Sequence, residues 1–282
     1  MDDWAKNLMG SFHHYVPKFY LRRFANSRGQ ITAYDLQKKR SFLANINKIA
    51  GERGLNSLIH MDFEDENQRV FIEQLFSELE SKYAVHAEAV LKMIDNEINL
   101  IEESRYGLAH MMFTQIYRSP RFRNLYNEVI ERSWLSYIES RHGQDSKLKN
   151  FIPEPKDYSF HIVKMMFDPK TGGADMCEEL VSEFYWMVLV NKSQTPFLTS
   201  DNPVIIYSQN GVKEVVYYPL SPKICIQLLR KERYPEFLER DGMHLHSRDK
   251  RAAIDINHNL FSTAERFVFG LPPNTFIENL VT

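Results

Sequence analysis

The hydrophobic pattern of this chain changes its period twice, and this limits the folds that it can adopt. Residues 64–142 carry apolar side chains at three- and four-residue steps, the spacing of amphipathic helices. The segments on either side, 12–50 and 184–282, hold short β-branched and aromatic runs separated by turn residues. Such segregation is typical of the α+β class. We therefore predict a mixed or antiparallel sheet built from N- and C-terminal segments, with a large helical block inserted between them.

The helical block divides into three predicted helices. The first begins with acidic residues at 64–66 and continues to about Ile94, and the others span Glu102–Tyr117 and Phe122–Glu139. Outside the block we predict short helices at 17–24 and near Arg248–Ile256, and a hairpin turn at Gln209-Asn210-Gly211. Strands are predicted at Ile31–Asp35, Trp186–Val190, Val204–Tyr207, Val212–Tyr218, Ile224–Leu229, Phe261–Thr263 and Phe267–Phe269.

A polar stretch at 143–157, which contains Pro153 and Pro155, is predicted to be a loop or linker. It leaves two organisations open. The chain either forms a single domain over residues 1–282, or its helical and strand-rich parts fold separately.

The composition excludes several classes of protein. The 282 residues carry 35 basic and 37 acidic side chains, a net charge of −2, so a nucleic-acid-binding surface would have to be a local basic patch. Cys177 and Cys225 form no C-x-x-C pair and fit a reducing compartment. The sequence has no signal-peptide pattern and no apolar run near 18 residues. We expect a cytoplasmic protein with no membrane partner, and the sequence leaves the oligomeric state open.

Two adjacent histidines, His13 and His14, lie just before Pro17 and Lys18. Imidazoles serve as acids, bases or metal ligands near neutral pH, and a helix that opens at Pro17 would offer free N–H groups to an anion. Adjacent side chains of an extended segment point to opposite sides. One histidine can therefore serve a site, with Lys18 beside it. The alternative is that one caps the local backbone and the other is solvated.

A second polar cluster, Ser200-Asp201-Asn202, follows an apolar run and precedes Pro203. At the end of a strand, Asp201 could ligate a cation or orient a histidine, while Ser200 and Asn202 supply hydrogen bonds. The alternative is ordinary turn chemistry, because Asp and Asn side chains bond their own backbone two residues further on.

Gln115 and Arg118 share a helical stripe with Leu108 and Met111. A polar and a charged side chain on an apolar face must be paired or line a cavity. Arg118 also opens a cluster, with Arg121 and Arg123, that suits phosphate. The alternative is a structural ion pair with a carboxylate of the helical block: Glu73 or Glu80.

Two other spacings carry less weight. Arg105 and His110 form the R-x4-H pattern of HEPN ribonucleases, but those enzymes are built from helical bundles, which the strand-rich C-terminal half does not fit. His244 and His246 could bind a metal on one strand face, but we expect a solvated hairpin tip there. The sequence contains no P-loop, dinucleotide-binding glycine pattern, G-x-S-x-G or H-E-x-x-H motif.

Several segments of the chain, taken in their order along the sequence, resemble a bacterial and fungal family called domain of unknown function 4238. The resemblance rests on HHYVPKFYLRRFA at 13–25, Gly29-Gln30-Ile31, Tyr34-Asp35, Glu73 and Glu80 on a helix, Gln115–Pro120, Phe197–Pro203, Tyr218–Pro222 and Asn257. It covers nearly the whole chain and implies one folded unit, but no function. It favours a common site for the following residues: His13, His14, Gln115, Arg118, Ser200, Asp201, Asn202 and Asn257.

The leading hypothesis is a hydrolase that acts on a phosphodiester, a nuclease in particular, with a role in bacterial or phage conflict by analogy. One histidine, His14 in preference to His13, would activate water or hold a divalent cation, Mg²⁺ or Mn²⁺, with Asp201. Arg118 would stabilise charge on the phosphate. Substrate contacts would come from Lys18, Gln115, Ser200, Asn202 and Asn257.

The alternative is a non-catalytic protein that binds a small anionic ligand, a nucleic acid or another partner. His13, Arg118 and Asn202 would then recognise the anion or a peptide terminus. A third interpretation makes the His, Arg and Asp side chains one buried structural network that ties the N-terminal helix to the sheet.

Overall fold

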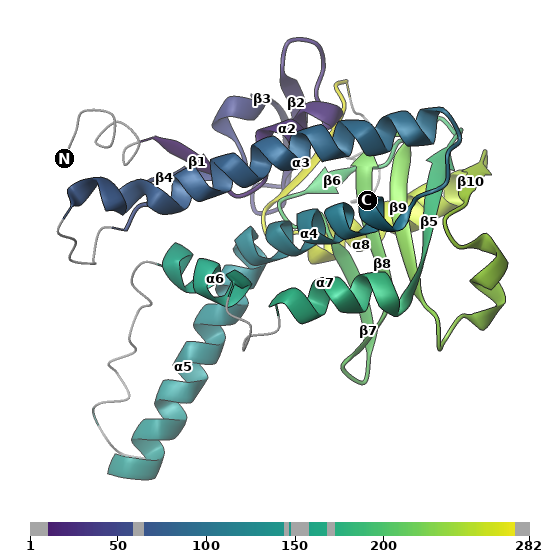
Figure 1. Cartoon of the computed structure of the whole chain (residues 1–282). Coiled ribbons are helices and arrows are strands. Elements are labelled where there is room, and N and C mark those ends of the chain that lie inside the picture. Colours follow the sequence, from purple (N-terminus) through teal and green to yellow (C-terminus); the bar gives the residue numbers. More distant parts are fainter. Residues whose placement is uncertain (1–10, 59–64, 144–146, 148–157, 168–172, 274–282) are drawn as a thin grey trace.

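The computed structural model describes residues 11–58, 65–143, 147, 158–167 and 173–273. Helices and strands are segregated along these residues, which confirms the predicted α+β class (Figure 1). The helical block contains the 3-10 helix η3 (Glu66–Val70) and the helices α3 (Phe71–Asp95), α4 (Glu102–Arg118), α5 (Pro120–His142), α6 (Tyr158–Phe167) and α7 (Gly173–Ser182). None of the helices in these ranges is long and apolar enough to cross a membrane.

The four-stranded antiparallel sheet joins the two ends of the chain, as predicted. Its strand order is β3-β2-β11-β6, with bounds Arg40–Asn45, Gln30–Asp35, Phe267–Gly270 and Thr199–Ser200. A small sheet pairs β1 (Phe12–His14) antiparallel with β4 (Gly51–Arg53). The N-terminal strands therefore depend on partners from both ends of the sequence.

The largest sheet comes from the C-terminal half alone. Its order is β10-β5-β9-β8-β7, with bounds His244–Ser247, Phe184–Asn191, Ile224–Arg230, Val212–Ser221 and Ile205–Gln209. The pair β10–β5 is parallel and the other pairs are antiparallel. The predicted β7–β8 hairpin is confirmed, since Asn210 and Gly211 both have positive φ, at 51° and 78°, as a two-residue turn of this kind requires.

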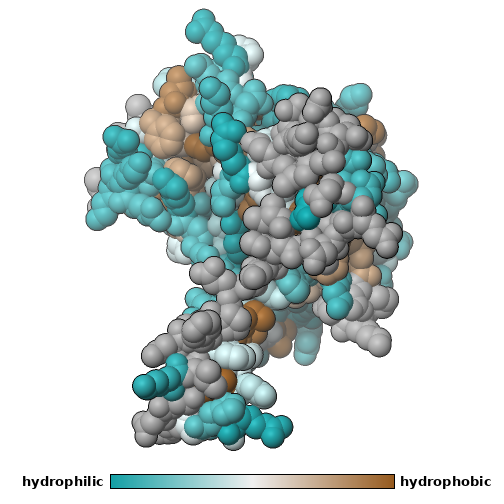
Figure 2. Space-filling model, turned by 90° about the vertical axis from the view of Figure 1, so that its left-hand side faces the viewer, coloured by the Kyte–Doolittle hydropathy of each residue, from teal (hydrophilic) through white to brown (hydrophobic). Residues whose placement is uncertain are grey.

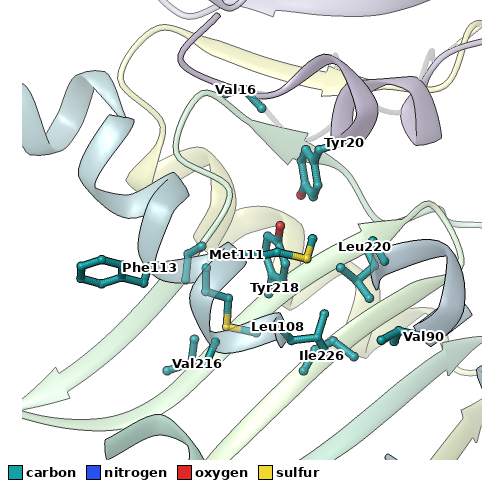
Figure 3. Close-up of a cluster of buried hydrophobic side chains, with 14 of the residues drawn as sticks. Val16, Tyr20, Val90, Leu108, Met111, Phe113, Val216, Tyr218, Leu220 and Ile226 are labelled. Atoms are coloured by element: carbon teal, nitrogen blue, oxygen red, sulfur yellow. The ribbon is translucent and has the colours of Figure 1, made fainter. Parts of the chain in front are cut away.

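Helices cover both faces of this five-stranded sheet (Figure 1). Along β8, Val216 and Tyr218 point into the large core, where they meet Leu108 and Met111 of α4 (Figure 3). Alternate residues point to the other face, against which α8 (Lys250–Thr263) packs through apolar residues at helical spacing: Ala253, Ile256 and Leu260. The alternation of side chains along one strand thus supplies two separate cores.

The N-terminal segment enters the core through the short helix α2 (Lys18–Leu21) and the 3-10 helix η1 (Arg22–Phe24). The Tyr20 ring stacks on Tyr218, with centroids 5.4 Å apart (Figure 3). The Tyr20 hydroxyl donates to the carbonyl of Pro219 at 2.6 Å and lies 2.8 Å from the Thr199 hydroxyl. One buried hydroxyl therefore ties this segment to β8 and to β6.

Two predictions about the C-terminal segment are wrong. Phe261–Thr263 is the last turn of α8 and not a strand, because Asp249 caps that helix and its apolar face continues to Leu260. His244 and His246 lie in β10 and not at a solvated hairpin tip, because β10 completes the edge of the sheet beside β5.

Helix α5 projects from the rest of the structure (Figure 1). The Ser119 hydroxyl accepts from the Phe122 N–H, Pro120 occupies the first turn, and Gly143 ends the helix with φ of 80°. Apolar side chains remain exposed along it, at Leu125 and Val129. The lower lobe of the space-filling view shows hydrophobic patches among hydrophilic ones (Figure 2).

Removal of the Tyr20 hydroxyl should destabilise the fold without disturbing the ring stack. In Tyr20→Phe, the Pro219 carbonyl and the Thr199 hydroxyl lose a buried partner, and the free energy of unfolding should fall by about 1–3 kcal/mol. Urea denaturation measures this change. Tyr137→Phe, at an exposed position on α5, is the control. A Tyr20→Phe variant as stable as the wild type would contradict the role given to this hydroxyl.

Candidate functional site

Strand β1 buries both histidines and gives each a partner. His13 is fully buried, and its Nδ1 accepts from the Asn56 N–H at 2.9 Å. The same nitrogen lies 3.7 Å from the Glu73 carboxylate. His14 donates from Nε2 to the carbonyl of Ile46 at 2.8 Å, and burial, the largest cause, lowers its pKa. His14 is therefore neutral at pH 7 and holds the main chain at Ile46.

Arg118 lies at the end of α4 and joins three segments. Its guanidinium donates to Glu80 of α3 at 2.7 Å and to the carbonyl of His14, and it stacks 4.1 Å from the centre of the Phe76 ring. The predicted structural pair with Glu80 is thus present. The Arg118 side chain is 4% exposed, so its donors serve the fold and not an incoming phosphate.

The other residues of that stripe and cluster also have partners within the protein. Gln115 donates from Nε2 to the Tyr218 hydroxyl, while its Oε1 is buried with no partner among the described residues. Arg121 reaches the Thr263 carbonyl at 3.4 Å, and Arg123 donates to both carboxylate oxygens of Glu52 at 3.1 Å. The three arginines therefore do not form a common phosphate site.

Asp201 fixes the main chain that leads into β11. Its two carboxylate oxygens accept from the N–H groups of Glu265, Arg266 and Phe267 at 2.9, 2.7 and 2.8 Å. The residue is fully buried. Burial raises the pKa of Asp201 to about 6, against the three main-chain hydrogen bonds, which lower it.

The remaining polar residues of this region brace the turn and the segment before it. The Ser200 hydroxyl accepts from the Asn202 N–H at 3.1 Å, and the Asn202 amide donates to the Thr263 carbonyl at 3.1 Å. Asn257 of α8 accepts from the Leu198 N–H and donates to the Pro196 carbonyl, both at 2.9 Å. Only the bond between Ser200 and Asn202 is the local turn chemistry given as the alternative; the Asn202 and Asn257 side chains bond to segments distant in the sequence.

The predicted site residues thus form two buried networks, one around His13, His14 and Arg118 and the other around Asp201, Asn202 and Asn257. Among the described residues, Asp201 forms no hydrogen bond or ion pair with either histidine. The described part of the chain also contains no group of three or more His, Cys, Asp or Glu residues that could hold a metal ion. This arrangement does not fit a Mg²⁺ or Mn²⁺ site shared by Asp201 and His14.

A cavity of about 390 Å³ lies where the two networks meet. We name it the Asp201 pocket, and its lining includes Asp201, Tyr15 and Pro120 together with these side chains: Phe12, Phe42, Lys48, Glu52, Arg266 and Phe267. Its volume is within the range of small-molecule sites. Tyr15 is buried in its wall, where burial first, and the carboxylates of Asp201 and Glu52 next, raise its pKa.

The buried networks hold the walls of this pocket in place. His14 bonds to Ile46 and so fixes the 3-10 helix η2 (Ile46–Lys48), and the Tyr15 N–H donates to the Ala50 carbonyl at 3.0 Å. On the opposite side, Asp201 clamps the main chain of Arg266 and Phe267. These motif residues therefore position the segments that carry Lys48 and Arg266.

The charges of the pocket are unevenly balanced. Glu52 is paired with Arg123, and the Asp201 oxygens are occupied by main-chain donors. Lys48 is exposed and has no ion pair or hydrogen bond with any described residue. Arg266 is 45% exposed, lies 4.6 Å from the centre of the Phe267 ring, and has a 3.4 Å contact with Asp35. Lys48 is thus a basic group without a carboxylate partner among the described residues, whereas Arg266 is paired with the buried Asp35 and only the rest of its exposed guanidinium can face an anion.

Sequence reasoning missed Lys48, Arg266 and Phe42. None lies in a motif with recognisable chemistry, and an exposed Lys or Arg looks like any other surface residue. Lys18, which was predicted as a substrate contact, is exposed on α2 near His14 and contributes to the lowered pKa of that histidine. It is absent from the lining of the Asp201 pocket.

The residues of the R-x4-H and H-x-H motifs do not act together in the structure, because the members of each pair have different neighbours. Arg105 pairs with Asp241 at 2.9 Å, whereas His110 has Cys177 as its neighbour at 3.6 Å. His246 lies 3.7 Å from Glu97, and the His244 ring nitrogens are buried with no partner among the described residues. Neither pair shares a pocket with the residues above.

The chain matches the model of the family described as protein of unknown function (DUF4238) over residues 13–274. It belongs to this family, as its motifs predict. Comparison with curated proteins and with solved structures found no match. The family supplies no activity, so the function has to be inferred from the geometry of the Asp201 pocket.

Loss of the Arg118 guanidinium should unfold the junction between α3, α4 and β1. We expect Arg118→Leu to lower the free energy of unfolding by about 3–5 kcal/mol, because Glu80 and the His14 carbonyl lose their buried cation. The double variant Arg118→Leu/Glu80→Leu should recover part of the loss. Arg132→Ala, which breaks an exposed pair on α5, is the control and should cost no more than about 0.5 kcal/mol. Equal effects of Arg118→Leu and the control would refute the role of Arg118.

His14 should make stability depend on pH. Because its pKa is lowered in the fold, the unfolded chain binds the proton first as pH falls below 6.5, and stability is lost from there downwards. His14→Gln can keep the donor to Ile46 without titrating. The difference in unfolding free energy between wild type and this variant, measured from pH 8 to pH 5, should be constant above about pH 7 and should change below it. A constant difference throughout would show that His14 titrates as it does in the unfolded chain.

Proposed function

We propose that this protein binds a nucleotide, or another small anion with a flat apolar group, in the Asp201 pocket. The observation that carries this proposal is the presence of two exposed basic side chains, Lys48 and Arg266, beside exposed aromatic surface at Phe42, within one cavity of about 390 Å³. Lys and Arg are the side chains suited to phosphate, and base stacking on aromatic rings tolerates any base.

The position of each group supports this assignment. Phe42 is 37% exposed and meets Phe267 edge to face, with centroids 6.2 Å apart, so a base can lie over Phe42 while Phe267 supports it. Arg266 is held over Phe267, and Lys48 approaches from η2 on another wall. A phosphate that bridges these two walls would satisfy both cations, and the neutralised Glu52 does not oppose it.

Hydrolysis of a phosphodiester is the second candidate, and one observation favours it. Burial raises the pKa of Asp201, a lining residue, to about 6, which is within the range of a general acid or base near neutral pH. This version of the hypothesis uses no metal. Its weakness is that the Asp201 oxygens already accept three main-chain hydrogen bonds.

Both cysteines are buried free thiols, which supports the cytoplasmic location predicted from the sequence.

Calorimetric titration with a nucleotide, a nucleoside and inorganic phosphate separates the contribution of the phosphate group to binding from that of the base. We expect adenosine monophosphate to bind more tightly than adenosine or inorganic phosphate. Lys48→Gln and Arg266→Gln should each weaken nucleotide binding by about tenfold, the value of one charge-assisted hydrogen bond. Phe42→Ala should weaken the nucleotide and leave phosphate unchanged. Lys48 is exposed and has no ion pair with a described residue, so Lys48→Gln should melt as the wild type does. Arg266→Gln also removes the ion-pair partner of the buried Asp35, so its melting temperature should fall and its binding is measured well below that temperature.

Lys92→Gln is the matched control, an exposed lysine on α3 outside the pocket lining. Binding that is equal for adenosine and its monophosphate, or unaltered in both pocket variants, would overturn the proposal. Hydrolysis is tested with a dinucleotide, with and without EDTA. Turnover that survives EDTA and is lost in Asp201→Asn, while that variant keeps the circular dichroism spectrum of the wild type, would favour the second candidate. Absence of turnover with retained binding would leave binding alone.

A further inference from the structure

A second cavity, of about 520 Å³, lies between the five-stranded sheet and α8. It shares no lining residue with the Asp201 pocket. Three aromatic side chains define it, Tyr207 of β7, Tyr217 of β8 and Tyr234, which precedes the 3-10 helix η6 (Pro235–Arg240). We name it the tyrosine pocket and propose that it binds a small organic cation that carries a primary ammonium group.

The rings provide a surface that attracts a cation. Tyr207 and Tyr217 meet at 90° with centroids 6.0 Å apart, and Gln227 donates to the Tyr217 hydroxyl at 3.1 Å, which fixes that ring. The faces of aromatic rings carry partial negative charge, and several rings around one space form the usual recognition site of an organic ammonium ion. Leu189, Val215 and Ile256 supply apolar surface for an alkyl chain.

All charged side chains that line the tyrosine pocket are acidic. Glu214 and Asp255 belong to the lining, and no Lys, Arg or His does. Arg233, outside the lining, pairs with Glu214 at 2.9 Å. Asp255 lies on the exposed side of α8 and forms no ion pair with any described residue. Arg251, one turn earlier on the helix, has Asp249 as its closer partner at 2.5 Å. Asp255 is therefore the carboxylate available to a cation at the mouth of the pocket.

The Tyr207 hydroxyl distinguishes a primary ammonium from a quaternary one. It is buried and has no hydrogen-bond partner among the described residues, which is a cost that a ligand can remove. Its pKa is raised, first by burial and then by Asp255, which places that carboxylate within electrostatic reach of the hydroxyl. An ammonium N–H can donate to the Tyr207 oxygen and face Asp255, whereas tetramethylammonium has no N–H to donate.

Calorimetric titration of the full chain with simple amines tests the proposal. Butylammonium should bind, and butanol, which has the same chain without the charge, should not. Tyr207→Phe should weaken butylammonium several-fold and leave tetramethylammonium unchanged, and Asp255→Asn should weaken both by about tenfold. Nα-acetyl-lysine amide carries the same ammonium on a peptide unit. Tighter binding of this compound would identify a lysine side chain of a protein as the source of the cation, and weaker binding would indicate a free amine.

Glu239→Gln, an exposed acidic position outside the lining, is the matched control. Asp255 is also exposed, so its variant should fold, and an unchanged melting temperature verifies this. Equal affinity for butylammonium and butanol would overturn the proposal, as would binding that neither Tyr207→Phe nor Asp255→Asn alters. Lys48→Gln, in the Asp201 pocket, should leave amine binding unchanged, so the two proposals can fail separately.

Discussion

Burial of the Arg118 guanidinium is the constraint on which the packing of the N-terminal half depends. An arginine cannot lose its charge, so the surrounding structure has to supply a carboxylate and further acceptors. These come from Glu80 on α3 and from the carbonyl of His14 on β1. Since Arg118 ends α4, its satisfaction requires α3, α4 and β1 to meet at one point. That meeting fixes the N-terminal strand, and through it Ile46 and η2.

Asp201 plays the corresponding part for the C-terminal half. A buried carboxylate needs donors, and three successive main-chain N–H groups supply them at the start of β11. Arg118 and Asp201 therefore do not pair with each other, because each has its own hydrogen-bond partners within its own network. Tyr20 connects the two halves, because its ring stacks on β8 and its hydroxyl reaches β6. The Asp201 pocket lies between parts that are each held rigidly.

The periodicity of apolar residues predicted those helices and strands that pack against the elements next to them in the sequence. The limits of α4 and the β7–β8 hairpin followed from Pro120 and from Asn210-Gly211. Helices α6 and α7 were not predicted, and β1 and β4 depend on a pairing across almost forty residues that no local pattern encodes. For the candidate site, the sequence identified the polar residues that need hydrogen-bond partners once the fold buries them. Their roles depended on which of them found main-chain partners, and this is a tertiary property.

This division between frame and contacts has a consequence for how such a protein can change its ligand. Substitution of Arg118 or Asp201 leaves a buried charge or several main-chain donors without a partner, which is among the costliest changes in a protein. Lys48 is exposed and has no ion pair with a described residue, so its replacement changes the charge of the Asp201 pocket at little cost in stability. A motif composed of frame residues can therefore persist while the ligand differs. If the Asp201 pocket binds a ligand as we propose, the recognisable motifs of this chain mark where the pocket is, and the exposed residues that line it determine what binds.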